Sequence, residues 1–93
     1  MKLSVIIPVY NEVLTAGAVV RRVLAQSVPG IEAIEVILVD DGSTDATGRA
    51  VGEVAAEFPG RVTVITHPKN LGKGAAVRSA ALRMTGDICI IQD

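Results

Sequence analysis

The chain has 93 residues, 49% hydrophobic and 20% charged, which is too apolar for intrinsic disorder and suits one small globular domain or part of a larger one. Nine basic and ten acidic residues give a formal net charge of −1, so no basic field would gather nucleic-acid phosphates or anionic lipid. One tyrosine and one phenylalanine offer no platform for stacking bases. We therefore expect no nucleic-acid partner.

The chain carries no sign of a secreted or membrane-spanning segment. Its first residues enter a strand-like segment directly, without the apolar region of a signal peptide. No apolar run approaches the roughly 18 residues of a transmembrane helix. The single cysteine, Cys89, lies in the apolar run 88–91, which predicts a small buried side chain and no disulfide or cysteine-zinc framework. A cytoplasmic location is predicted for this part of the protein.

Four short runs rich in β-branched residues predict strands at 3–9, 35–39, 62–66 and 88–91. These runs are nearly continuous apolar stretches without strict alternation, a pattern typical of parallel sheets that are covered on both faces. Helical spacing of apolar residues predicts three helices between them. The first carries its stripe at Ala16, Val19, Val20, Val23 and Leu24, and the second and third cover about 45–58 and 72–84.

The predicted order is therefore β-α-β-α-β-α-β, an α/β, Rossmann-like parallel sheet of about four strands with three crossover helices. Asp45 is expected to cap the second helix, and the alanines of the third predict close packing of helix on sheet. In open sheets of this kind, ligands bind beyond the carboxyl ends of the strands. The segments that follow the four strands read PVYNE (8–12), DDGS (40–43), HPKN (67–70) and QD (92–93).

Acidic and amide groups gather at this predicted edge. Gathering carboxylates costs repulsion unless a cation or a ligand donor offsets it, so three acidic strand ends favour a functional site over ordinary polar turns. Gly42 and Ser43 suit a turn, but Asp40 and Asp41 have no such structural role. A carboxylate there could accept hydrogen bonds from the N–H groups of a uracil or guanine ring.

The segment NLGKG (70–74) precedes the third helix. Its glycines allow close backbone approach, and Lys73 offers a point charge to a diphosphate, although a plain helix start with a solvated lysine is an equal alternative. A phosphate-binding P-loop is excluded, because His67 stands at the first glycine position and Gly74 at the hydroxyl position. His67 itself is expected to be a hydrogen-bonded loop residue, and Tyr10 either stacks on a base or closes the first turn.

Four segments together resemble one family: SVIIPVYNE (4–12), VDDGSTD (39–45), NLGKGAA (70–76), and TGD (85–87) leading into IQD (91–93). The sequence is similar to family-2 glycosyltransferases of the GT-A fold, and most similar to polyprenyl-phosphate hexose synthases of the dolichyl-phosphate mannose or glucose type. The resemblance implies that residues 1–93 are the nucleotide-sugar-binding part of such a domain, incomplete at the C-terminus.

The resemblance also implies roles for individual residues. The nucleotide-binding set it implies is Pro8, Tyr10, Asn11, Glu12, Asp40, Asp41 and Lys73. Within that set, Glu12 would lie near the ribose, the acidic pair would read the base, and Lys73 would lie near the diphosphate. Asp93 matches the first acid of a D-x-D motif that holds Mg²⁺ or Mn²⁺, which fits a leaving diphosphate whose growing charge needs neutralising.

The implied activity is hexose transfer from a UDP- or GDP-sugar to an acceptor, and one candidate acceptor is polyprenyl phosphate at a membrane, with the full-length protein membrane-associated. Catalytic residues are expected beyond Asp93, so the 93 residues alone are expected to be inactive in transfer. The pattern of these 93 residues does not identify the sugar, the base, the acceptor or the oligomeric state.

Three other classes remain open at this point. A phospho-acceptor receiver domain also gathers aspartates at parallel strand ends, but it carries the acidic pair after the first strand, and here the pair follows the second. A dinucleotide-binding oxidoreductase is disfavoured, because Val77 occupies the place of the third glycine. A stable scaffold without a ligand is the remaining alternative.

Overall fold

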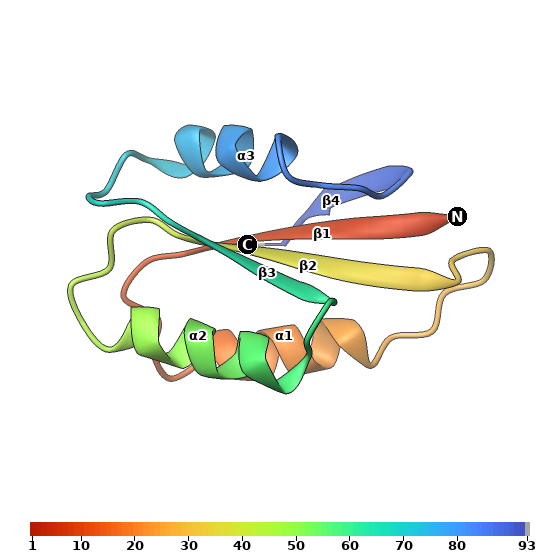
Figure 1. Ribbon diagram of the computed structural model, residues 1–93, viewed down its shortest axis with the longest axis horizontal. Coiled ribbons are helices and arrows are strands. Elements are labelled where there is room, and N and C mark those ends of the chain that lie inside the picture. The colour runs from red at the N-terminus through yellow and green to blue at the C-terminus, as the bar shows by residue number, and fades with distance from the viewer. Residues whose placement is uncertain (93) are drawn as a thin grey trace.

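The protein is an α/β structure in which one parallel sheet lies between two layers of helices (Figure 1). The computed structural model describes residues 1–92. In this range the strands are β1 (Lys2–Val9), β2 (Ala33–Asp40), β3 (Val62–Thr66) and β4 (Ile88–Ile91). The helices are α1 (Ala16–Leu24), α2 (Thr47–Glu57) and α3 (Lys73–Ala81). The predicted element order is therefore confirmed.

Most element bounds lie within two residues of those predicted. The bounds of β3 and β4 agree with the prediction, while β2 starts at Ala33 and extends through Asp40. Helix α2 begins at Thr47, and its N-cap position is Ala46, which makes no side-chain cap hydrogen bond. Asp45, the predicted cap, lies one position earlier and accepts the Thr47 backbone N–H at 2.9 Å. Helix α3 ends at Ala81, three residues before the predicted end.

The strand order is β3-β2-β1-β4, and every pairing is parallel. The chain therefore moves outward from β1 to β3 and then returns to place β4 on the other side of β1. In a receiver-type sheet the first strand lies between the second and the third, whereas here β1 lies between β2 and β4. The point at which the strand order reverses lies beside the carboxyl end of β1.

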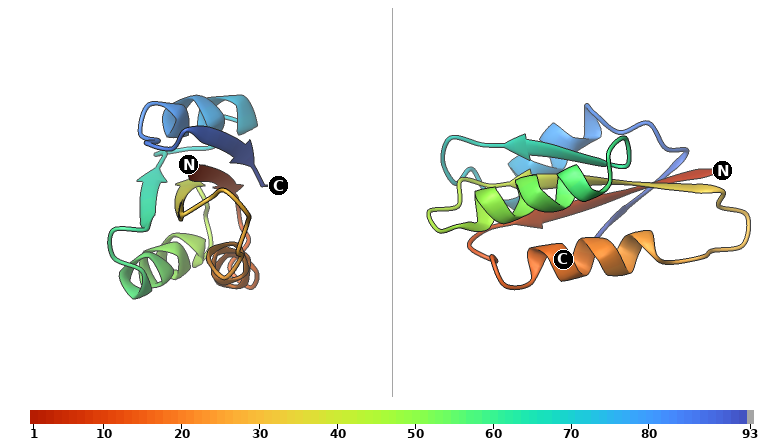
Figure 2. Two further views of the ribbon diagram at one scale, coloured as in Figure 1. Left: turned by 90° about the vertical axis from the view of Figure 1, so that its right-hand side faces the viewer. Right: turned by 60° about the horizontal axis from the view of Figure 1, so that its bottom comes forward.

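The two faces of the sheet are covered unequally. Helices α1 and α2 pack on one face and α3 on the other, as the end-on view of Figure 2 shows. The first face buries a large aliphatic core that includes Val20, Val36, Leu38, Val51 and Val54. The second face buries Ile6, Ile37 and Val39 against Ala76 and Ala80. The prediction of close packing by the alanines of α3 is confirmed, since both are fully buried.

Strand β4 corrects one prediction. Its apolar sequence predicted a buried Cys89, but Cys89 is exposed, and so are the other three residues of the strand. Among residues 1–92, β4 lies at one edge of the sheet and pairs with β1 alone, and the helices pack mainly on the other three strands. No helix in this described part of the chain is long and apolar enough to cross a membrane.

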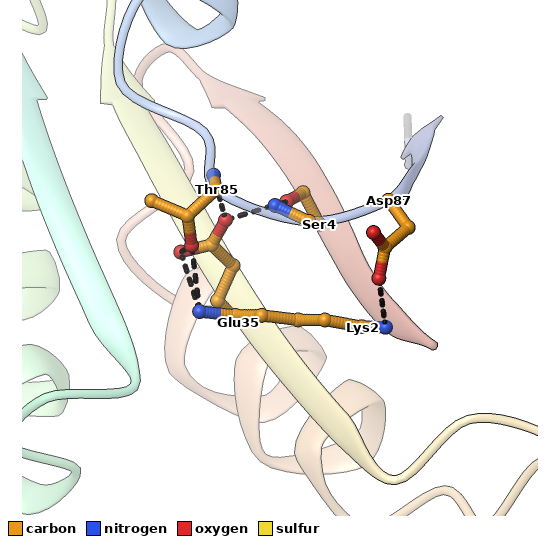
Figure 3. Close-up of polar contacts among 6 residues, drawn as sticks. Lys2, Ser4, Glu35, Thr85 and Asp87 are labelled. Atoms are coloured by element: carbon orange, nitrogen blue, oxygen red, sulfur yellow. Dashed lines mark hydrogen bonds and ion pairs between the residues drawn. The ribbon is translucent and has the colours of Figure 1, made fainter.

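A polar cluster joins the amino ends of β1 and β2 to the turn before β4 (Figure 3). The Glu35 carboxylate accepts the Ser4 hydroxyl at 2.5 Å, the Thr85 backbone N–H at 2.6 Å and the Thr85 hydroxyl at 3.1 Å. The Gly86 N–H in turn donates to the Ser4 hydroxyl at 2.8 Å. A Cβ at Gly86 would lie 2.4 Å from that hydroxyl, so only glycine allows this approach. The cluster thus fixes the entry of β4 into the sheet.

Glu35→Gln is expected to lower the free energy of unfolding by about 1–3 kcal/mol, because the amide replaces one of two acceptor oxygens with a donor facing Thr85 and Ser4. Chemical denaturation of the full-length protein measures the change. The control is Glu53→Gln, which alters an exposed side chain on α2 whose ion pair with Arg49 is 3.9 Å long. An equal change in the two variants would contradict the role given to Glu35.

Candidate functional site

A cleft of about 250 Å³ lies at the carboxyl edge of the sheet, beside the point where the strand order reverses. It is lined by Pro8, Val9, Tyr10, Asp41, Asn70, Gly72 and Lys73. Three segments far apart in sequence therefore meet there: the end of β1, the residue after β2 and the start of α3. Ligands of open α/β sheets bind at this place.

Asp41 is the acidic residue of this cleft. It is 5% exposed, and its Oδ1 accepts hydrogen bonds at 2.9 Å from the His67 ring and from the Leu71 backbone N–H. Its Oδ2 accepts the Gly72 N–H, also at 2.9 Å. Burial alone would raise the pKa of this carboxyl, but the hydrogen bond from the ring and those from the two backbone N–H groups hold its pKa below the usual value. The cleft therefore presents an ionised carboxylate at neutral pH.

His67 is the hydrogen-bonded loop residue that the sequence predicted. It is 8% exposed, and its two ring nitrogens contact Asp41 at 2.9 Å and the Ser79 hydroxyl of α3 at 2.8 Å. It does not line the cleft. Sequence reasoning missed Ser79, whose position on the sheet-facing side of a predicted helix was the only available signal.

Asp40 points away from the cleft, although it precedes Asp41 directly. Successive residues at a strand end face opposite sides of the sheet. Asp40 is 3% exposed, its Oδ1 accepts the Ser43 N–H at 3.0 Å, and its Oδ2 lies close to Gly48 of α2. The structure therefore does not bring Asp40 together with Asp41, and it gives Asp40 the turn-forming contact that the sequence had assigned to neighbouring residues.

Asn11 joins the loops after β1 and β2. Its side-chain oxygen accepts the Thr44 N–H at 2.9 Å, and its own N–H donates to the Ser43 hydroxyl at 3.0 Å. Asn11 has a φ of +50°, a left-handed conformation that asparagine tolerates better than most residues. It lies outside the cleft lining and holds two of the surrounding loops in register.

Glu12 follows on the exposed rim. Its backbone N–H donates to the Thr47 hydroxyl of α2 at 2.9 Å, and its carbonyl accepts the N–H groups of Thr15 and Ala16 at the start of α1. The Glu12 carboxylate lies 3.4 Å from the Tyr10 N–H and does not line the cleft. Tyr10, in contrast, lines the cleft and is 43% exposed, so its ring is available to a ligand.

The segment 69–72 forms the wall opposite β1. It packs against Gly42, which has a φ of +74° and whose missing Cβ would lie 2.3 Å from the Lys69 carbonyl carbon. Lys73 begins α3 and lines the cleft together with Asn70 and Gly72, which the sequence analysis did not name as binding residues. Their signal was the NLGKG segment, whose glycines were expected only to allow close backbone approach and whose Asn70 had been given no role.

Asp93, the predicted metal ligand, lies outside the described residues. Gln92 immediately before it donates its N–H to the Ile6 carbonyl at 2.9 Å, so the chain still runs alongside β1 at that point. Residues 1–92 contain no group of three histidine, cysteine, aspartate or glutamate side chains that could hold a metal ion.

The whole of this architecture has counterparts among solved structures. The mannosyltransferase PcManGT from Pyrobaculum calidifontis, in complex with GDP-Man and Mn²⁺, matches 98% of this chain and 26% of its own at 33% identity, with a TM-score of 0.86. S. aureus TarS 1-349 in complex with UDP-GlcNAc matches 100% of this chain and 26% of its own at 29% identity, with a TM-score of 0.79. Both of these structures hold a nucleotide sugar, GDP-Man in the first and UDP-GlcNAc in the second.

Sequence comparison gives the same result. An undecaprenyl-phosphate 4-deoxy-4-formamido-L-arabinose transferase from Sodalis glossinidius is 37% identical over 93 residues, covering 99% of this chain and 28% of the relative. The chain thus spans little more than a quarter of the curated relatives that it matches. The family model described as glycosyl transferase family 2 matches residues 4–93. With the sheet order, the cleft and this match in agreement, the chain belongs to glycosyl transferase family 2.

Proposed function

We propose that the full-length protein transfers a hexose from a UDP- or GDP-sugar to an acceptor, and that the acceptor is a polyprenyl phosphate. Residues 1–93 are the nucleotide-sugar-binding part of a GT-A domain in this proposal. The observation that carries it is the cleft at the carboxyl edge of the sheet, which combines the buried carboxylate of Asp41 with the ammonium of Lys73. The relatives whose names include undecaprenyl phosphate support the acceptor class.

The roles follow from chemistry. A nucleotide base offers ring N–H donors, and the Asp41 carboxylate is the acceptor for them, while Pro8 and Tyr10 supply the apolar and aromatic walls of the base site. Lys73 neutralises part of the diphosphate charge at the start of α3, where backbone N–H groups also favour anions. Outside the cleft lining, Glu12 on the exposed rim lies toward the ribose in this proposal, while Asn11 and the buried Asp40 shape the loops around the nucleotide site.

A divalent cation fits this site in one mode. Mg²⁺ and Mn²⁺ prefer oxygen ligands, and Mg²⁺ is usually held by one or two carboxylates together with substrate phosphates. In this proposal Asp93, together with the diphosphate of the substrate, supplies the oxygen ligands. When bound, the cation would neutralise the charge of the leaving nucleoside diphosphate. Transfer to a lipid phosphate would place the full-length protein at a membrane surface.

The proposal is tested by binding and transfer with the full-length protein. Isothermal titration with Mn²⁺ present is expected to give binding of UDP or GDP, and Lys73→Ala is expected to weaken that binding about tenfold, because it removes a charge beside the diphosphate. Binding of the nucleoside, uridine or guanosine, is expected to change little in this variant. The exposed Arg49→Ala on α2 is the control.

Sugar transfer is tested with a labelled UDP- or GDP-hexose and undecaprenyl phosphate in detergent. Label in the lipid fraction supports the acceptor class. Nucleotide binding without lipid labelling would overturn the proposed acceptor class and keep the proposed nucleotide site. The absence of any nucleotide binding would overturn the whole proposal.

A further inference from the structure

The proposed function gives His67 no role, yet His67 is a buried titratable side chain in contact with the carboxylate of the cleft. It lies between two elements: its Nδ1 is 2.9 Å from Oδ1 of Asp41, and its Nε2 is 2.8 Å from the Ser79 hydroxyl of α3. Every buried polar side-chain atom of the described residues has a hydrogen-bond partner. The His67 ring is therefore held at both ends.

We propose that His67 is a positioning residue, which links Asp41 to Ser79 and so fixes the Asp41 carboxylate with one acceptor position left for a ring N–H of the nucleotide base. This inference rests on the proposed function, because it assumes that a nucleotide occupies the cleft.

The hydrogen-bond directions follow from the chemistry of the three groups. An ionised carboxylate only accepts, so the contact with Asp41 requires a proton on Nδ1 of His67. In the neutral ring Nε2 is then an acceptor, and it accepts a hydrogen bond from the Ser79 hydroxyl. The Asp41 carboxylate thus selects the tautomer, and the Ser79 hydroxyl, which can donate or accept, completes the arrangement by donating to Nε2 and holding the ring in place.

Counting acceptor positions gives the consequence for the ligand. A carboxylate has about four lone-pair positions. Oδ1 of Asp41 receives two donors, the His67 ring and the Leu71 N–H, while Oδ2 receives one, the Gly72 N–H. One position on Oδ2 is left, on a side chain that lines the cleft. Without the ring, each oxygen would keep one backbone N–H donor, and a second acceptor position would open on Oδ1, so the ring N–H of a base would no longer have a single defined acceptor.

The experiment is a double-mutant-type cycle in the full-length protein, in which the His67 side chain and the ring N–H of the base are removed separately and together. The probes are UDP with 3-methyl-UDP and GDP with 1-methyl-GDP, in which methylation removes the ring N–H. In the unaltered protein, methylation of the nucleotide that binds is expected to weaken affinity by at least about tenfold, the usual loss for a hydrogen bond to a charged group. In His67→Leu this penalty is expected to fall below about threefold.

His67→Asn provides the rescue. The asparagine amide can place an N–H near the position of Nδ1 and restore the donor to Asp41, so its methylation penalty is expected to stay within about threefold of the unaltered protein. A merely structural role would weaken the methylated and unmethylated nucleotides equally and would leave the penalty unchanged. If His67→Leu does not fold by circular dichroism, Ser79→Ala, which removes the partner of Nε2, replaces it and is expected to reduce the penalty in the same direction.

The outcomes separate this inference from the proposed function. Binding of UDP or GDP with a methylation penalty that His67→Leu or Ser79→Ala leaves unchanged overturns the inference and keeps the nucleotide site. A penalty of less than about threefold in the unaltered protein also overturns it, because the base N–H would then not reach Asp41. If neither nucleotide binds the unaltered protein, the proposed function fails and this inference fails with it.

Discussion

Gly42→Ala is expected to lower the free energy of unfolding by about 3 kcal/mol or more and to weaken nucleotide binding at least about tenfold. The added Cβ would lie 2.3 Å from the Lys69 carbonyl carbon and 2.5 Å from the Asn70 nitrogen, so backbone must move. The φ of +74° adds strain for any residue with a side chain. The displaced segment forms one wall of the cleft and donates two N–H groups to Asp41, so stability and binding should fall together.

Gly60→Ala is the matched control for this change. Gly60 has nearly the same backbone conformation, with a φ of +80°, but a Cβ there would meet nothing within 4 Å. It therefore reports the cost of the left-handed conformation alone, about 1 kcal/mol. Chemical denaturation and nucleotide titration of both variants make the measurement. Equal losses in the two variants would mean that close packing of the loop on Gly42 contributes nothing.

Asp41→Asn has the second large expected effect. Three N–H groups point at this carboxylate, and an amide offers them one oxygen and turns an NH₂ group toward the others. The buried, unsatisfied donors are expected to cost about 3 kcal/mol of unfolding free energy at pH 7. Asp45→Asn is the control, since its exposed carboxylate accepts the Thr47 N–H and hydroxyl through one oxygen, which an amide oxygen can replace.

The pH dependence of this difference identifies its cause. The folded state holds the pKa of the Asp41 carboxyl below its usual value, so the ionised group stabilises the fold above the ordinary carboxyl pKa of about 3.9. That contribution is lost as the pH falls below about 4 toward the lowered pKa. The stability gap between the unaltered protein and Asp41→Asn should therefore be full at pH 7 and narrow in acid. If the difference in unfolding free energy between the two proteins stays constant as the pH falls below about 4, the charge of Asp41 is not its origin.

Much of the fold could be predicted because its signals are local. The apolar residues of β1 to β4 and of α1 follow spacings that extend over only a few residues, and this spacing distinguishes a strand from a helix. Right-handed crossovers then leave few arrangements for parallel strands. Whether helices pack over a given strand cannot be predicted in this way, because it depends on the position of that strand in the sheet. Cys89 has the sequence surroundings of a core residue, but among residues 1–92 its strand lies at the edge of the sheet, where the side chain is exposed.

The site was partly predictable for the same reason. The carboxyl ends of parallel strands share one edge, so Pro8, Tyr10, Asp41 and Lys73 could be expected to lie together, and they line one cleft. Which of two adjacent aspartates faces that cleft depends on the pleat at the end of β2. The sequence does not define that pleat with single-residue precision. Glu35 contacts Thr85, 50 residues further along the chain, and His67 contacts Ser79, 12 residues further along, and no local pattern shows these pairs.

The opposite orientations of Asp40 and Asp41 limit how this protein can change. A deletion or insertion of one residue within β2 would shift the strand by one position and exchange the faces of all that follows. The carboxylate that faces the cleft would then be buried against α2, and the aliphatic side chains of both cores would turn to the wrong layer. Length variation among natural relatives is therefore expected to fall in the connections between elements, such as 25–32, and to spare the interior of this strand.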